Sequence, residues 1–258
     1  MSEEKDLLGI RPFGEATKSI VDSTLSGVGR FLSAVCLPAC EELGRMLQDG
    51  IRSWRLNNII RVLEKSEGKL EFCDNQFQLR ANPKVALSII ENASLVDDDT
   101  LQEWWAGLFA SSCTEDGKDD QNLIFVNLLK DLTAFEVKVL SYCCFNCKKY
   151  IYPNKLIYTN HDFRVSLEEI ISLTGVTDVR RIDRELDHMI SLGLLSNGLI
   201  NVSGFIVDDE EMVAHLTPSA LALNLYYKAN TITLTPEEFW GDSLEPYSEE
   251  TQIQEASH

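Results

Sequence analysis

The chain has 258 residues, a length that suits one large or two small domains. Of these residues 44% are hydrophobic and 25% are charged, which is an ordinary composition for a globular protein. Its net charge of −18 opposes binding to nucleic acid and to anionic membranes, because both carry negative charge. Seven cysteines, an odd number at irregular spacing, fit a reducing cytoplasm better than a disulfide framework, so we expect a cytoplasmic protein. The longest uncharged apolar run, residues 31–40, is too short to span a bilayer.

The N-terminal part divides into an irregular arm and an apolar segment. Residues 1–14 mix Glu, Asp, Gly and Pro without periodicity, which predicts a loosely ordered arm. Residues 15–40 carry apolar side chains at helical spacing, so they form either a helix docked on the domain or an amphipathic segment lying on a membrane. Lys18 and Arg30 alone offer weak attraction to lipid headgroups, and we therefore expect the docked helix.

Residues 41–65 predict one long helix. Glu41 and Glu42 stand at its start and basic residues stand at its end, which matches the helix dipole. Trp54 lies within its apolar stripe, so we expect this indole in the core.

Two further helices are predicted within residues 82–113. Asn82 followed by Pro83 is a helix start, because Asn accepts a hydrogen bond from a first-turn amide and Pro needs no partner there. Carboxylates at Asp97 to Asp99 can cap the next helix. The apolar residues of that helix form one face: Leu101, Trp104, Trp105, Leu108 and Phe109. Two adjacent Trp residues, each able to bury roughly 150–250 Å², make this helix the packing centre of a helical scaffold domain.

Several stretches resemble the Abi-alpha family of bacterial abortive-infection (phage resistance) proteins. They are EELGRMLQDGIRSWRLNNIIRVLEK at 41–65, Pro83-Lys84, IIENASLVDDDTLQEWWAGLFAS at 89–111 and HLTPSALALNLY at 215–226. The resemblance covers roughly residues 35–230 and implies a role in anti-phage defence. The family is defined by sequence and phenotype rather than by a catalytic motif, so the resemblance transfers no functional residues to this chain.

A polar stretch suggests how the chain is divided. Residues 116–121, DGKDDQ, stand between strongly apolar patterns and are interpreted as a boundary. The helical scaffold domain would then occupy residues 15–115 and a second module residues 122–230, with its last helix starting at Thr217-Pro218. Residues 241–258 form an acidic tail that we expect to be frayed.

The second module has the element order of a winged helix. Capping boxes at Thr133 and Ser166, each followed by Glu three residues later, begin two helices. Thr177 or Asp178 caps a third helix, and residues 199–207 are predicted as strands of a β-ribbon. The predicted fold class is therefore mainly α, with a helical scaffold followed by a winged-helix-like α+β module.

The third helix of this module is a candidate nucleic-acid interface. Arg181, Arg184 and His188 share one helix face, as a helix in the major groove would require. Acidic residues on the same helix, and a run of acids at 208–211, offset these basic groups. We therefore expect contacts with protein, with DNA binding as the alternative.

Cys144 and Cys147, with His161 further on, are a candidate metal site because CxxC spacing can place two thiolates on one ion. A closed zinc site needs four ligands in tetrahedral array, and the sequence offers no clear fourth. Buried cysteine is also an ordinary small apolar residue. We expect no bound metal and no cofactor.

Motifs for enzymatic chemistry are absent from the sequence: there is no phosphate-binding glycine loop, nucleophile elbow, HExxH or dinucleotide fingerprint. The sequence analysis therefore favours a non-enzymatic interaction protein in anti-phage defence, binding a phage or host protein or a second copy of itself. A winged-helix DNA-binding regulator is the second hypothesis. A membrane-associated effector acting through residues 15–40 is the third.

Overall fold

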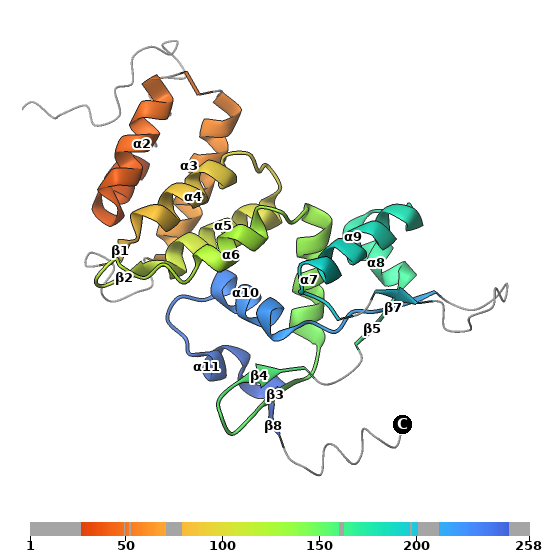
Figure 1. Cartoon of the computed structure of the whole chain (residues 1–258). Helices are drawn as coiled ribbons and strands as arrows, with labels where there is room; N and C mark the ends of the chain where they lie inside the picture. Colours follow the sequence, from red (N-terminus) through yellow and green to blue (C-terminus); the bar gives the residue numbers. More distant parts are fainter. Residues whose placement is uncertain are drawn as a thin grey trace, which may run out of the picture. The chain divides into compact units, whose positions relative to one another are not determined.

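The fold is mainly helical and divides into two units (Figure 1). The computed structural model describes residues 27–48, 50–51, 53–70, 79–159, 163–196, 198–200 and 212–247. The first unit contains residues 1–131 and 228–233, and the second contains residues 132–227 and 234–258. Within the described ranges, no helix combines the length and the apolar character needed to cross a membrane.

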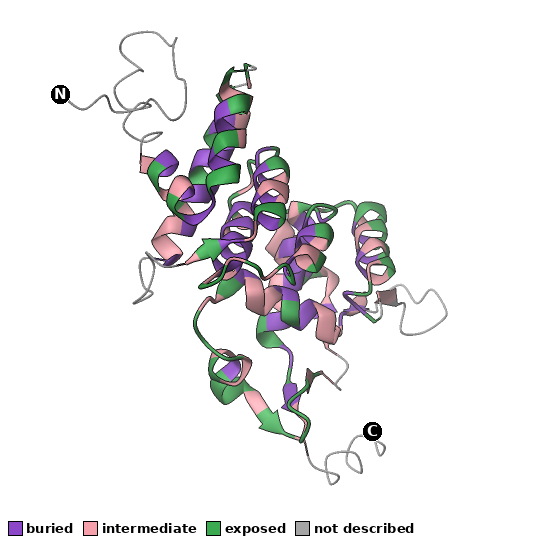
Figure 2. Cartoon of the chain, turned by 60° about the vertical axis from the view of Figure 1, so that its left-hand side comes forward, coloured by how far each residue is buried: buried purple, intermediate pink, exposed green. Residues whose placement is uncertain are grey.

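The first unit consists of helices and one short β-ladder. A helix over residues 27–35 is followed by α2 (Leu37–Gln48), α3 (Ser53–Leu70), α4 (Pro83–Ala93), α5 (Asp99–Ser111) and α6 (Leu123–Leu129). Strand β1 (Arg80–Ala81) pairs antiparallel with β2 (Cys113–Thr114). Helix α5 lies among α3, α4 and α6, and buried residues line the inward sides of these helices (Figure 2).

The α5 core is confirmed. The five residues of its predicted face are all buried: Leu101, Trp104, Trp105, Leu108 and Phe109. The helix starts are confirmed as well, since the Asn82 side chain accepts a hydrogen bond from the amide of Lys84 at 3.0 Å. Asp98 Oδ1 accepts from the amides of Thr100 and Leu101 at 2.9 and 3.0 Å.

The prediction of a single helix over residues 41–65 is wrong, because the helix is interrupted between α2 and α3. Gly50 has a φ of 78°, a left-handed conformation that glycine adopts without a Cβ penalty, and it ends α2. Trp54 therefore lies at the start of a new helix, outside the face that buries Ile59 and Leu63. Its side chain is 45% exposed, so the prediction of Trp54 as a core residue is wrong.

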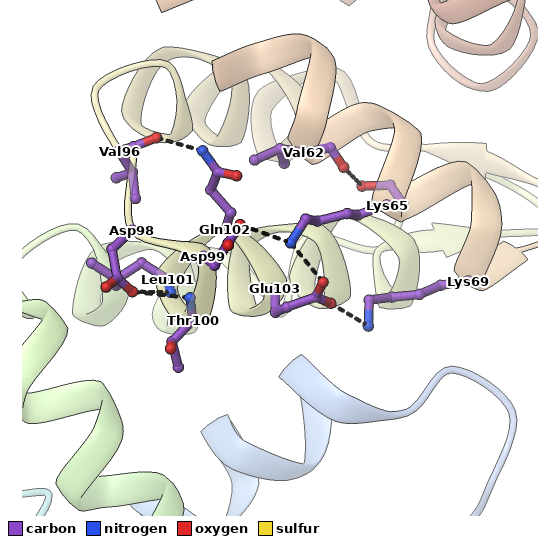
Figure 3. Close-up of polar contacts among 11 residues, drawn as sticks. Val62, Lys65, Lys69, Val96, Asp98, Asp99, Thr100, Leu101, Gln102 and Glu103 are labelled. Atoms are coloured by element: carbon purple, nitrogen blue, oxygen red, sulfur yellow. Dashed lines mark hydrogen bonds and ion pairs between the residues drawn. The ribbon is translucent and has the colours of Figure 1, made fainter. Parts of the chain in front are cut away.

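Charged side chains join α3 to α5 at the edge of this core (Figure 3). Lys65 Nζ lies 2.7 Å from Glu103 Oε1, and Lys69 Nζ lies 3.1 Å from Glu103 Oε2. Burial opposes the charge of Glu103, but the hydrogen bonds from the two lysines outweigh it and lower the pKa of this carboxyl. Gln102 Nε2 donates to the carbonyl of Val96 at 2.9 Å and fastens the loop between α4 and α5.

Helix α6 belongs to the first unit, so the chain divides after Asp131 rather than within residues 116–121. Asn122 connects α6 to the end of α5: its Nδ2 donates to Ser112 Oγ at 2.9 Å and to Ser111 Oγ at 3.0 Å. The polar stretch at 116–121 is therefore a surface loop inside this unit.

The second unit combines helices with two small sheets. Its helices are α7 (Ala134–Asn146), α8 (Leu167–Thr174), α9 (Val179–Ser191), most of α10 (Ala220–Asn230), α11 (Pro236–Trp240) and the 3-10 helix η2 (Gly241–Ser243). Its strands are β3 (Lys149–Ile151), β4 (Ile157–Tyr158), β5 (Arg164–Ser166), β6 (Leu199–Ile200), β7 (Val213–His215) and β8 (Leu244–Pro246). One sheet has the order β5-β7-β6 and is antiparallel, and the other has the order β4-β3-β8, with β3 and β8 parallel.

Local signals in this unit act as predicted at three helix starts. Thr133 and Ser166 begin α7 and α8 with complete capping boxes, and Asp178 caps α9. The last predicted helix begins at Ala220 rather than at Thr217, because Pro218 pairs with Leu195 in an isolated bridge. The sheet of β3, β4 and β8 was not predicted, and most of the ribbon predicted at 199–207 lies outside the described residues.

Replacing Trp105 by Ala should lower the free energy of unfolding by about 3–5 kcal/mol, because this indole is 1% exposed and fills the core. Trp54→Ala is the matched control and should cost less than about 1 kcal/mol. Urea unfolding of both variants tests the pair. Equal decreases in the free energy of unfolding would mean that Trp54 is also packed in the core.

A second prediction concerns Gly107 of α5, which contacts the end of α10 inside the first unit. A Cβ at Gly107 would lie 1.7 Å from the carbonyl oxygen of Ala229, so Gly107→Ala forces the backbone apart and should cost about 1–3 kcal/mol. Gly68→Ala in α3 meets nothing within 4 Å and should stabilise the chain by about 0.5–1 kcal/mol. Thermal unfolding of both variants measures these opposite signs, and a stabilising Gly107→Ala would refute the close contact.

Candidate functional site

A buried carboxylate joins α7 to α9 in the second unit. Glu136 is 0% exposed, and its Oε2 accepts a hydrogen bond from the amide of Thr133 at 2.7 Å. Its Oε1 lies 2.7 Å from His188 Nδ1, on α9. Burial raises the pKa of Glu136, although the hydrogen bonds from Thr133 and His188 act in the opposite direction. The carboxyl thus serves both as a helix cap and as the partner of an imidazole.

The same cluster continues to the surface through a second carboxylate. Thr133 Oγ1 donates a hydrogen bond to Glu185 Oε2, and Arg181 Nε donates to Glu185 Oε1 at 3.0 Å. Glu136, His188, Thr133, Glu185 and Arg181 therefore form one connected network, which we name the α7–α9 network. It fixes the rotation of α9 relative to α7.

This network divides the predicted nucleic-acid face. Arg181 and His188 are both held by carboxylates of the same unit, and His188 is directed at α7. Arg184 is exposed on α9. The structure therefore does not bring Arg181, Arg184 and His188 together as a basic surface whose charges are free for phosphates.

The predicted metal ligands Cys144 and Cys147 lie at the end of α7, and His161 lies outside the described residues. Cys147 Sγ donates to the carbonyl of Cys144 at 3.7 Å. Burial raises the pKa of both thiols, whereas a metal ligand has to be a thiolate. Across the part of the chain that the structure describes, no three His, Cys, Asp or Glu side chains gather as a metal site would require.

Lys149 is a buried cation beside these thiols that the sequence analysis missed. Its Nζ donates to the carbonyl of Cys147 at 2.8 Å and to that of Phe145 at 3.2 Å, both at the C-terminal end of α7. The amine also lies 4.6 Å from the ring centroid of Trp240. Burial lowers the pKa of Lys149, although Cys147 and Cys144 raise it.

Two sequence signals could have identified these groups. Glu136 is the third helical residue of a capping box, a position whose side chain folds back toward the helix start. Lys149 follows the end of α7, where the helix dipole favours a cation. Neither signal names the partner, because His188 and Trp240 are distant in sequence.

Stability should depend on pH through Glu136. A carboxyl with a raised pKa in the folded state stabilises the fold below its ordinary pKa, and this contribution is lost as the pH rises through the raised value. Glu136→Gln retains a capping acceptor but does not titrate. As the pH rises above the ordinary glutamate pKa of about 4.3, the wild-type chain should lose stability relative to Glu136→Gln, as measured by urea midpoints. Parallel pH curves would show that burial does not perturb this carboxyl.

Comparison with known proteins identifies the family of the chain. Residues 56–236 match the family described as abortive infection alpha, and this range includes both the α5 core and the α7–α9 network. No curated protein and no solved structure matches the chain. Because the match spans more than half of the sequence, the chain belongs to the abortive infection alpha family.

Proposed function

We propose that the chain acts in bacterial anti-phage defence as a cytoplasmic, non-enzymatic interaction protein that binds another protein. The single observation that carries this proposal is the family match over residues 56–236, because abortive infection is a form of phage resistance. The non-enzymatic part rests on the sequence, which contains none of the catalytic motifs considered above.

We further propose that the second unit is a winged-helix-like module. Its elements include α7, β5, α8, α9, β6 and β7 in this order, with β3 and β4 inserted between α7 and β5, and β7 lies between β5 and β6 in the sheet. Three helices interleaved with a three-stranded antiparallel sheet in this order support that assignment. In this proposal α9 corresponds to the helix that a DNA-reading member would place in the major groove.

Protein binding fits the surface better than DNA binding does. Arg181 and His188 are engaged by Glu185 and Glu136, and the net charge of −18 repels a phosphate backbone. Large aromatic side chains are exposed instead, with Phe145 at 70%. Exposed aromatic residues of this kind supply the anchors of protein interfaces.

The third hypothesis, a membrane effector acting through residues 15–40, is disfavoured where the structure describes that segment. Val28, Leu32 and Val35 are buried in the first unit, so this part of the apolar stripe already packs against protein. The Phe31 and Phe109 ring centroids are 6.1 Å apart. Residues 15–26 lie outside the described residues.

Phage plating in a bacterial host that expresses the chain, with host viability scored in parallel, tests the proposal. The wild-type chain should reduce plaque formation at the expense of infected cells. Trp54→Ala and Phe145→Ala should each weaken protection if the side chain is an interface anchor, since losing such an anchor lowers affinity by about thirtyfold or more.

The double variant Arg181→Ala with Arg184→Ala is the matched control for the DNA-binding hypothesis. This variant should retain protection. The wild-type chain itself should show no detectable duplex binding at physiological salt in a gel-shift assay. A salt-sensitive shift that is lost in this variant would replace the proposal with the regulator hypothesis. Undiminished plaque formation with the expressed wild-type chain would refute the defence role itself.

A further inference from the structure

The C-terminal residues Leu234–Tyr247 lie across the second unit as a segment that we name the strap. The strap comprises α11, η2 and β8, and β8 extends the sheet by pairing in parallel with β3 (Figure 1). In this register Lys149 is opposite Leu244 and Ile151 is opposite Pro246. The amide of Tyr247 donates to the carbonyl of Ile151 at 3.0 Å and prolongs the pairing.

One aromatic side chain anchors the middle of the strap. Trp240 is the buried residue of α11, and its ring stacks on Tyr226 of α10 with centroids 5.7 Å apart and planes at 19°. Lys149 Nζ lies 4.6 Å from the centroid of the same indole. The indole therefore sits between an aromatic face and an amine, which is a geometry that selects for an aromatic residue.

Contacts at the two ends of the strap are closer to the surface. Tyr247 stacks on Tyr152 with ring centroids 4.0 Å apart and planes at 19°. Lys155 Nζ lies 3.6 Å from Glu237 Oε1, and both side chains are substantially exposed. The exposed ion pair thus adds little to the stability of strap closure compared with Trp240 and the strand pairing.

The strap binds in the manner of an added peptide strand. Extended peptides dock on a sheet edge through main-chain hydrogen bonds, while a pocket takes one side chain. The strap reproduces the strand pairing through β8 on the β3 edge, and its anchoring side chain, Trp240, comes from the preceding helix α11 and lies beside Lys149. It is also acidic, with Glu237, Glu238, Asp242 and Glu245 and no basic residue.

When the strap closes, the Lys149 amine loses its contact with water, and this desolvation is unfavourable. This amine donates to two carbonyls and interacts with the Cys147 side chain, and the Trp240 ring lies over it. Removing an amine from water opposes closure, because water solvates the ammonium better than carbonyls and an indole do. The contribution of these contacts to strap closure is therefore smaller than their number alone suggests.

We propose that β3 and the site that holds Trp240 form a docking edge for an acidic segment of a partner protein that carries a tryptophan on a helical turn followed by a short strand, and that the strap is its resident, autoinhibitory occupant. The inference rests on the proposed protein-binding role and adds to it a docking surface that is separate from the exposed side chains of Trp54 and Phe145. The family match ends at residue 236, just after the strap begins at Leu234, so the edge lies within the matched region and most of the occupant lies beyond it.

A labelled peptide with the sequence of residues 234–247 tests the edge in the full-length chain. Trp240→Ala should open the strap, because loss of a packed indole weakens closure by about a hundredfold or more. The peptide should then bind the Trp240→Ala chain in fluorescence anisotropy and bind the wild-type chain at least tenfold more weakly. A peptide in which Ala replaces the tryptophan is the control and should bind neither chain.

Two charge-reversal variants test the strap while Trp240 stays unchanged. Lys155→Glu places a carboxylate beside Glu237 and should speed hydrogen exchange of the strap amides about two- to fivefold. Lys148→Glu makes the same charge change at an exposed neighbour of β3 and should leave these amides unchanged.

The proposal is overturned if the peptide fails to bind a Trp240→Ala chain that retains its helical circular dichroism. If that variant loses its helical signal, equal exchange in Lys155→Glu and Lys148→Glu overturns it. Both measurements use purified protein, so their failure leaves phage protection by the wild-type chain standing. Conversely, absent protection with intact peptide binding would refute the defence role and retain the docking edge.

Discussion

Burial of the α5 face is the interaction on which the rest of the first unit depends. Trp104, Trp105 and Phe109 are buried on α5, which is the main packing partner of α3 and also contacts α4 and α6. The polar contacts follow from this arrangement, because Lys65 and Lys69 reach Glu103 only when α3 lies along α5. Hydrophobic burial thus supplies the main stabilisation, and the ion pairs align α3 with α5.

The parts of the fold that were predictable are those specified by neighbouring residues. Asn82, Asp98, Thr133 and Ser166 cap helices because their side chains reach amides two or three residues away. The break at Gly50 was missed, because the apolar pattern can be continued through it by a rotation of the stripe. Sheets formed by strands of two or three residues leave almost no periodicity to detect.

The candidate site was less predictable because its chemistry comes from distant pairs. The sequence placed Arg181, Arg184 and His188 on one helix, and helical geometry alone could not show that Glu136 and Glu185 engage two of them. Burial has the same consequence for Cys144 and Cys147, whose spacing suggests metal ligands but whose surroundings disfavour thiolates. A polar residue acquires its role from the partner it meets, and a single sequence does not record that partner.

The pairing of β3 with β8 also bears on the order in which the second unit folds. Its capping boxes form within a single helical turn. Lys149 and Leu244, in contrast, can pair only after most of the unit between them has become compact. The entropy lost in closing so long a loop slows the formation of contacts of this kind. We therefore expect helices α7 and α8 to form first and the parallel strand to be added last, on a surface that the earlier steps have already built.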